Sequence, residues 1–169
     1  METGHTFYAT YTKDQLLAAT ARHEAGHAVM RYLVGLPCTE ISIDVNAPGN
    51  GFCAGTGRLV APWDLLLVDL AGPVAEVYPY SVIPEGSVDE DFRHACEIVD
   101  GAFAGDRTVL AFACAEAKEL IGRHFGVVAT LGELLLDLQV VAAEEVAALC
   151  RDRIRRRRSV GRRGKATAR

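Results

Sequence analysis

The sequence lacks the cysteine pairs that mark a disulfide-rich protein or a cysteine-ligated zinc knuckle. Its 169 residues include five cysteines, an odd number, and no two of them form a C-x-x-C pair. We therefore expect reduced, buried thiols, which are typical of proteins in a reducing compartment. The cysteines are Cys38, Cys53, Cys96, Cys114 and Cys150.

Long apolar runs are also absent. No uninterrupted apolar stretch approaches the roughly 20 residues that a membrane span needs. The first residues, Met-Glu-Thr-Gly-His, are polar and lack the apolar segment of a signal peptide. No Walker A sequence is present, so nothing in the chain indicates ATP binding. From these absences we expect a soluble, cytoplasmic protein.

Half of the residues are apolar, which indicates a folded chain long enough for one domain with its own core. The net charge of −4 is distributed unevenly. Residues 151–169 hold ten of the eighteen Lys and Arg and one acid, Asp152, so they carry +9 and the remainder carries −13. We therefore divide the chain into a domain, 1–150, and a basic C-terminal tail, 151–169.

The basic tail contains the run Arg155-Arg156-Arg157-Arg158. Such a segment can contact nucleic acid or an anionic membrane, and it can equally fold back onto its own acidic domain. A solvated helix end is the simplest alternative, because cations suit a helix C-terminus. We expect any contact with nucleic acid or membrane to be weak.

The most informative stretch is His23-Glu24-Ala25-Gly26-His27, which has the H-E-x-x-H form. Histidines four apart on a helix lie on the same face, where two imidazoles can hold one metal ion. Glu24 flanks that face, and a carboxylate beside a metal-bound water can take its proton. A five-residue pattern can also occur by chance on an ordinary surface helix, so the surrounding sequence must show whether this one is a metal site.

The surrounding sequence predicts a helix from about Lys13 to Val34. Thr12-Lys13-Asp14-Gln15 has the form of a capping box, and Gly35 is a natural helix end. A glycine in mid-helix, such as Gly26, costs about 1 kcal/mol relative to alanine. Together with Ala25 it leaves room for a closely packed neighbour, which is a reason to tolerate that cost.

The remaining sequence predicts a mainly helical domain with a small sheet. Alternation over Thr39–Val45 predicts a half-buried strand, residues 46–57 have the composition of a loop, and Gly57–Ala61 has a strand-like pattern. Helices are expected over 64–78, 87–104, 108–124, 127–138 and 143–157, with a loop over 79–86 and breaks at Gly126 and over Gln139–Val141.

A catalytic zinc site has three protein ligands and one open position, so a third ligand must come from outside the motif. The candidates by residue type are Asp89, Glu90, Asp91, His94, Glu76 and His124. Acids at a helix start also complement the helix dipole without a metal, so residue type alone leaves the choice open. Glu76 is either a residue that orients a ligand histidine or an acid at the wet edge of a buried helix.

Three segments resemble, in order, motifs of the FtsH-type zinc metallopeptidases, the protease half of the membrane-bound AAA proteases. His23–Val29 is similar to the zinc-site helix of that family, and Leu70–Glu76 is similar to its Gly-Gly-Arg-x-Ala-Glu helix. Gly86–Ala95 is similar to its Gly-Ala/Ser-x-x-Asp segment, whose Asp is the third zinc ligand. The resemblance covers about residues 12–150.

The resemblance implies a zincin-like helical peptidase domain with H-E-x-x-H on its first long helix. His23, His27 and Asp91 would bind Zn²⁺, and Glu24 would be the general base. We choose Asp91 over Asp89 because Asp91-Phe92-x-x-Ala95 keeps the spacing of the family, although Gly86 and Asp91 are one step further apart than usual.

The chain departs from the family in two ways. Pro73 replaces the usual arginine, and the ATPase domain and membrane anchors are absent. The implied activity is a zinc-dependent endopeptidase that cleaves flexible or unfolded polypeptide segments without ATP. The alternative is a catalytically silent, zinc-stabilised interaction module whose basic tail docks nucleic acid, anionic membrane or a protein partner, and the sequence leaves the oligomeric state open.

Overall fold

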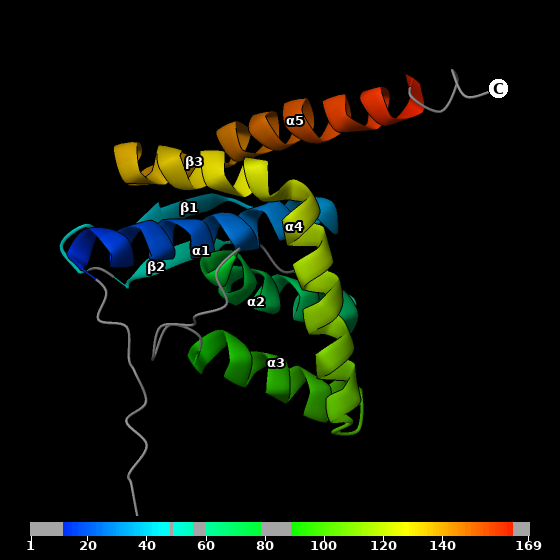
Figure 1. Ribbon diagram of the computed structural model, residues 1–169. Coiled ribbons are helices and arrows are strands. Elements are labelled where there is room, and N and C mark those ends of the chain that lie inside the picture. The colour runs from blue at the N-terminus through cyan, green and yellow to red at the C-terminus, as the bar shows by residue number, and fades with distance from the viewer. Residues whose placement is uncertain (1–11, 48, 56–59, 79–88, 164–169) are drawn as a thin grey trace, which may run out of the picture.

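The computed structural model describes residues 12–47, 49–55, 60–78 and 89–163, of which Asp89 and 155–163 are described by their backbone alone (Figure 1). Within these ranges the chain is mainly helical with a small sheet, as predicted, and the sheet has three antiparallel strands. The elements are α1 (Lys13–Leu33), β1 (Glu40–Ile43), β2 (Gly51–Ala54), α2 (Pro62–Val77), α3 (Asp89–Ala102), α4 (Arg107–Leu138), β3 (Val140–Ala142) and α5 (Ala143–Arg163).

Helix α1 begins and ends where the sequence signals lie. The Thr12 hydroxyl accepts a hydrogen bond from the Gln15 backbone N–H at 3.2 Å, and the Gln15 side chain accepts one from the Thr12 N–H at 2.9 Å. These two bonds form the predicted capping box. Gly35, just after the C-cap Val34, has φ +77°, a left-handed conformation that glycine adopts without strain.

Helix α1 lies between the sheet and α2 (Figure 1). The approach of α2 is close because Gly26 has no side chain. A Cβ at Gly26 would lie 2.5 Å from Ala75 Cβ and 2.6 Å from the Ala71 carbonyl oxygen. The packed neighbour predicted from Ala25 and Gly26 is therefore α2, which lies against the metal-motif segment of α1.

The sheet has the order β2–β1–β3, with β1 antiparallel to both neighbours. Ile41 of β1 is paired with Cys53 on one side and with Val141 on the other, and its side chain is fully buried. Strand β1 lies inside the predicted span, Thr39–Val45. Strand β2 is an edge of this sheet and runs beside α1.

Two strand predictions need correction. Residues 46–57 were expected to form a loop, but Gly51–Ala54 pairs with β1, and Val140–Ala142 forms the other edge where a helix break was expected. Strands of three or four residues are too short to show a reliable alternating pattern in the sequence. Whether such a segment forms a strand therefore depends on its pairing with β1. Most of the strand predicted at Gly57–Ala61 lies outside the described residues, and its last two residues are not in a strand.

The predicted break at Gly126 is also wrong, because α4 continues through it as one helix of 32 residues. Val127 and Val128, which follow Gly126, are buried in the core. Their burial outweighs the roughly 1 kcal/mol that a mid-helix glycine costs relative to alanine. The loop predicted over 79–86 and the capping residue Ser87 lie outside the described residues.

Helix α5 runs without interruption across residue 150, where the sequence placed the boundary between domain and tail. Cys150 is fully buried and Ile154 is 6% exposed, so the packed part of α5 extends to at least Ile154. Arg151 and Arg153 are exposed between them. Among the described helices, none combines the length and the hydropathy of a membrane span.

Candidate metal centre

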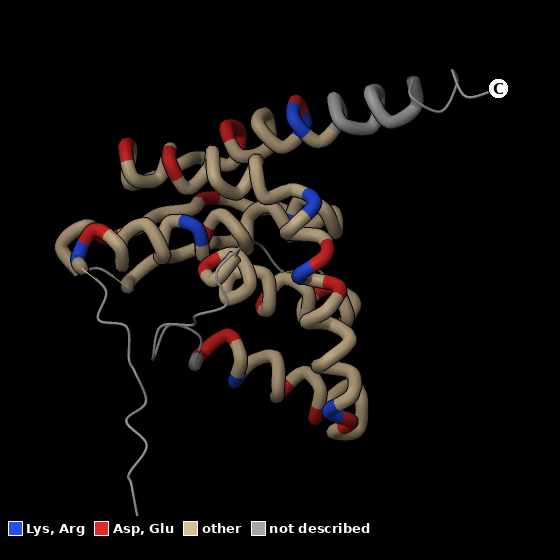
Figure 2. The backbone as a smooth tube through the Cα atoms, viewed as in Figure 1, with Lys and Arg blue, Asp and Glu red and all other residues tan. Residues whose placement is uncertain are grey.

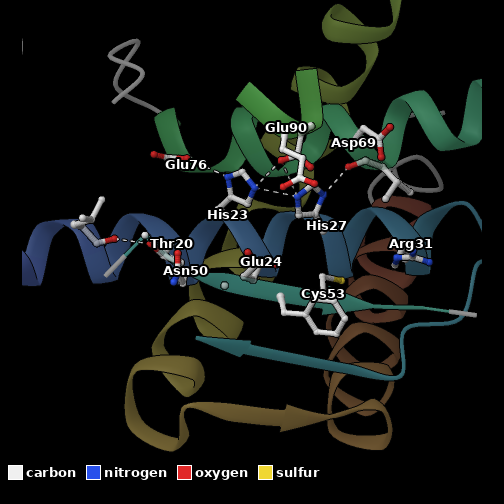
Figure 3. Close-up of a pocket in the computed structure, with 16 residues that line it drawn as sticks. Thr20, His23, Glu24, His27, Arg31, Asn50, Cys53, Asp69, Glu76 and Glu90 are labelled. Carbon is white, nitrogen blue, oxygen red and sulfur yellow. Dashed lines mark hydrogen bonds and ion pairs between the residues drawn. The ribbon is translucent and has the colours of Figure 1, made fainter. Parts of the chain in front are cut away.

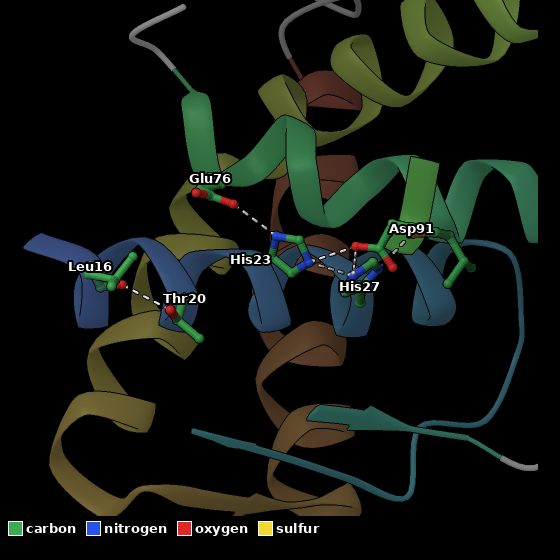
Figure 4. Close-up of polar contacts among 7 residues, drawn as sticks. Leu16, Thr20, His23, His27, Glu76 and Asp91 are labelled. Carbon is green, nitrogen blue, oxygen red and sulfur yellow. Dashed lines mark hydrogen bonds and ion pairs between the residues drawn. The ribbon is translucent and has the colours of Figure 1, made fainter. Parts of the chain in front are cut away.

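Helix α1 presents the two motif histidines on one buried face. His23 and His27 are each 8% exposed, and their Nε2 atoms lie 3.0 Å apart. Asp91 reaches them from the first turn of α3, where acidic residues gather (Figure 2). Its Oδ2 lies 2.9 Å from His23 Nε2 and 3.3 Å from His27 Nε2 (Figure 4). Among the described residues, these three form the group of side chains that could hold a metal ion.

Each imidazole is held from behind by an acceptor on α2. His23 Nδ1 donates to Glu76 Oε2 at 3.0 Å, and His27 Nδ1 donates to the Val68 carbonyl oxygen at 2.8 Å (Figure 4). A carbonyl oxygen and an ionised carboxylate only accept hydrogen bonds, so these partners place the ring protons on Nδ1. When the rings are neutral, both Nε2 atoms carry lone pairs on the side of Asp91. Protonation of His23 adds a proton on its Nε2, which then donates to Asp91 Oδ2 at 2.9 Å.

Three electron-rich atoms therefore converge in one small buried space. Burial opposes protonation of His23, but its hydrogen bonds with Asp91 and Glu76 outweigh that effect and raise its pKa to about 9. Burial likewise opposes ionisation of Asp91, but the contacts with His23 and His27 hold the pKa of its carboxyl well below the usual range. The raised pKa of His23 and the lowered pKa of Asp91 both show that the group favours a positive charge among its three ligand atoms.

Helix α2 leaves the two Nε2 atoms uncovered because residue 72 is glycine. A Cβ at Gly72 would lie 2.6 Å from His23 Nε2 and closer still to His27 Nε2. Ligand atoms about 2.0–2.2 Å from a tetrahedral zinc ion lie about 3.3–3.6 Å apart, so the three side chains would need to separate by only a few tenths of an ångström. Two imidazoles and a carboxylate suit a divalent transition metal. The residues present therefore fit a metal ion.

Glu24 lies beside this group and extends toward the sheet. It is 6% exposed, and a Cβ at Gly51 of β2 would lie 2.6 Å from its Cγ. Burial raises the pKa of the Glu24 carboxyl, although the neighbouring His27 and His23 act in the opposite direction. A carboxyl whose pKa is raised holds a proton more readily than an exposed one, which suits a group that accepts and returns a proton.

A cavity of about 670 Å³ opens over the three metal-site side chains and Glu24. Residues 49–53 line it on the side of β2, α2 and the first turn of α3 line the opposite side, and α1 lies between them (Figure 3). Five of the lining side chains are aspartate or glutamate, and one, Arg31, is an arginine. The cavity therefore reaches the candidate centre beside the edge strand β2.

Three other residues considered as third ligand, His94, Glu90 and His124, lie outside this group. His94 Nδ1 is 2.8 Å from Asp69 Oδ2, and the His94 side chain is 53% exposed. Glu90 borders the cavity with a side chain that is 91% exposed, and His124 borders a different cavity. None of them belongs to the group with His23 and His27. The side chain of Asp89 lies outside the described residues.

Sequence reasoning missed two contributions of α2, the Val68 carbonyl and the bare backbone at Gly72. A backbone carbonyl carries no signal in the sequence. A glycine inside an otherwise apolar, buried helix is a usable signal of a close approach, because it costs helix stability without adding buried surface.

The sequence matches no protein-family model and no curated protein sequence. The features that indicate a function are therefore the H-E-x-x-H motif and the geometry of this group.

Proposed function

We propose that this chain is a zinc-dependent endopeptidase with a zincin-like, FtsH-type domain, which hydrolyses peptide bonds in flexible or unfolded polypeptides. The observation that carries the proposal is the position of Glu24, a buried carboxyl beside the convergent group of His23, His27 and Asp91. A metal site with a purely structural role would not require Glu24. The free cysteines are consistent with a cytoplasmic location.

The metal would be held by Nε2 of His23, Nε2 of His27 and the carboxylate of Asp91. Glu76 and the Val68 carbonyl would keep the two rings in the orientation that directs Nε2 at the ion. When bound, zinc supplies Lewis-acid chemistry, since it polarises a carbonyl and lowers the pKa of water.

Glu24 would accept the proton of the attacking water and then deliver it to the leaving amine nitrogen as the C–N bond breaks. Its burial serves this role, because burial raises the pKa of the carboxyl and so favours its protonated form relative to an exposed glutamate. The neighbouring His27 and His23 lower the pKa of Glu24 and so limit this rise.

Strand β2 suggests how the substrate binds. It pairs with β1 on one side, and its other edge borders the cavity, so an extended peptide could add to the sheet through main-chain hydrogen bonds. The sequence suggested Gly57–Ala61 for this role, and the described structure favours Gly51–Ala54. Because only an extended segment can pair in this way, the proposal limits the substrates to flexible or unfolded chains.

A second candidate function is a catalytically silent, zinc-stabilised interaction module. It is favoured by α5, whose backbone continues past the buried Ile154 to Arg163, and by Arg151 and Arg153, which are exposed on the same helix. In that case the metal group would stabilise the fold, and the basic tail would bind nucleic acid, anionic membrane or a protein partner.

A Glu24→Gln variant separates the two functions. Zinc content is measured by elemental analysis, and cleavage is followed with a fluorescently labelled unfolded protein. We expect about one zinc per chain in both proteins and a rate about 10²–10⁴-fold lower in the variant. Glu90→Gln is the matched control, because Glu90 borders the same cavity but is 91% exposed, and it should cleave normally.

Cleavage by Glu24→Gln at the rate of the unchanged protein would contradict the role of Glu24. Failure of the zinc-loaded, unchanged protein to cleave any flexible peptide would favour the interaction module.

A further inference from the structure

Two thiols meet beside the candidate metal centre. Cys38 Sγ and Cys53 Sγ lie 3.9 Å apart, although the residues are separated by 15 positions. Cys38 precedes β1, and Cys53 lies on β2 opposite Ile41. The odd number of cysteines and the absence of C-x-x-C gave no sign of this pair, because the pairing of β1 with β2 brings the two residues together.

The two thiols face different cavities. Cys53 contributes to the cavity over the metal centre, on the side of β2 (Figure 3). Cys38 contributes to a separate cavity of about 340 Å³, which α1 and α5 border with Tyr32 and Ala147. A small solute can therefore reach Cys38 without passing the candidate metal centre.

The surroundings distinguish the two sulfur atoms. The Arg31 guanidinium donates to the Pro37 carbonyl oxygen at 3.2 Å, next to Cys38 in the chain. A hydrogen bond from Cys53, aided by the positive charge of Arg31, lowers the pKa of Cys38 despite its burial. The same hydrogen bond, together with burial, holds the pKa of Cys53 well above its ordinary value. Cys38 is thus the better nucleophile, and Cys53 is the thiol beside it.

We propose that Cys38 and Cys53 are a redox-responsive pair that forms a disulfide when a peroxide oxidises Cys38. The pair stands on its own geometry and does not depend on the proposed peptidase activity. To form the disulfide, the sulfur atoms must approach from 3.9 Å to about 2.05 Å. Rotation of the two side chains, with small shifts of β2 and of the segment before β1, can supply this movement.

The chemistry proceeds in two steps. The Cys38 thiolate attacks one oxygen of hydrogen peroxide, the O–O bond breaks, and the departing hydroxide takes up a proton to become water. Cys38 is now a sulfenic acid. The Cys53 sulfur then attacks the Cys38 sulfur, the S–O bond breaks, and the departing hydroxide leaves as water with the proton of the Cys53 thiol. Two thiols are oxidised, and one peroxide is reduced to two waters.

The remaining cysteines are poorer partners. Cys150 interacts electrostatically with Cys38, but it is fully buried, and burial raises its pKa to about 12, so it stays a thiol. Cys96 lies on α3 and Cys114 on α4, outside the pairing of β1 with β2 that brings Cys38 and Cys53 together. A disulfide between Cys38 and Cys53 would tie the segment after α1 to the strand that borders the metal-site cavity.

The test uses the full chain, fully reduced and then treated with hydrogen peroxide. Free thiols are counted, and peptides are analysed by mass spectrometry without reduction. We expect two of the five thiols to disappear, a peptide that links Cys38 to Cys53, and full recovery with a reductant. Cys114→Ser and Cys150→Ala are matched controls that should still form the linked peptide.

The Cys53→Ser variant identifies the attacking sulfur. Without Cys53, oxidation should stop at a Cys38 sulfenic acid that a dimedone probe captures, whereas Cys38→Ser should give no dimedone adduct on Cys53. Survival of all five thiols at a peroxide concentration that oxidises free glutathione would overturn the proposal. So would a linked peptide that joins any other two cysteines in the folded protein.

Discussion

Gly72 of α2 faces His27 of α1 across the candidate metal centre, and no side chain at residue 72 separates them. A Cβ on Gly72 would overlap Nε2 of His27, and it would lie 2.6 Å from Nε2 of His23. Val68 and Glu76 lie four residues before and after Gly72, so one face of α2 contributes a carbonyl, an open space and a carboxylate to the two imidazoles.

Replacing Gly72 with alanine should remove metal binding, because the added methyl group would occupy the space in front of both Nε2 atoms. We expect zinc affinity to fall at least about 10–100-fold, the range for residues that support metal ligands. Competition with a chelator measures this affinity. Gly126→Ala in α4 is the matched control, because a Cβ there meets nothing within 4 Å. It should keep zinc and gain about 0.5–1 kcal/mol in unfolding free energy.

Glu76→Gln should weaken zinc binding about 10–100-fold while the protein stays folded, because a neutral amide holds the Nδ1–H of His23 less strongly than a carboxylate does. Chelator competition, together with circular dichroism, measures both effects. Glu97→Gln is the control, since Glu97 is exposed and pairs with Arg93 on α3. Equal zinc affinity in Glu76→Gln and the unchanged protein would show that the Glu76 carboxylate does not strengthen zinc binding by His23.

Asp69 should make the stability of the metal-free protein depend on pH. Burial raises the pKa of Asp69 to about 6, although His94 on α3 and His27 on α1 act in the opposite direction and Asp91 adds to the rise. The folded state therefore holds the Asp69 proton more tightly than the unfolded state. This contribution to stability is complete below about pH 4, near the ordinary aspartate pKa, and is lost as pH rises through 6.

Asp69→Asn stays neutral and should be about 1–2 kcal/mol more stable than the unchanged protein above pH 6, after allowance for the lost ion pair with His94. The two proteins should differ little near pH 4. Urea unfolding of both, in the presence of a chelator, measures the difference across this range. A difference that stays constant from pH 4 to pH 8 would rule out Asp69 as its source.

Removal of the chain after Ile154 should abolish weak binding of polyanions. The removed residues, 155–169, carry eight Lys and Arg and no acid, whereas Ile154 itself is packed in the core. We expect the full chain to bind DNA and anionic vesicles at low salt and to release them near physiological ionic strength, where the Debye length is about 8 Å. Both chains should retain zinc. Binding by the shortened chain would place the contact elsewhere, and binding that survives physiological salt would indicate a dedicated docking element.

The sequence by itself determined α1, its ends and the two histidines on its buried face. These features are local, since the capping box spans Thr12 to Gln15, the stop is Gly35, and the four-residue spacing of His23 and His27 becomes a shared face as soon as the helix forms. The sequence also predicted a mainly helical domain with a small sheet, because long periodic segments carry that information within themselves.

The family spacing favoured Asp91, but only the tertiary structure decided that its carboxylate meets both histidines, which groups hold their rings, and that β2 borders the cavity. Asp91 is 68 residues from His23, and its approach depends on how α3 packs against α2 rather than on any local spacing. The Val68 carbonyl and the Cys53 thiol likewise acquire their roles from a helix contact and a strand pairing. Such contacts join distant parts of the chain, so the packing of the whole domain selects them.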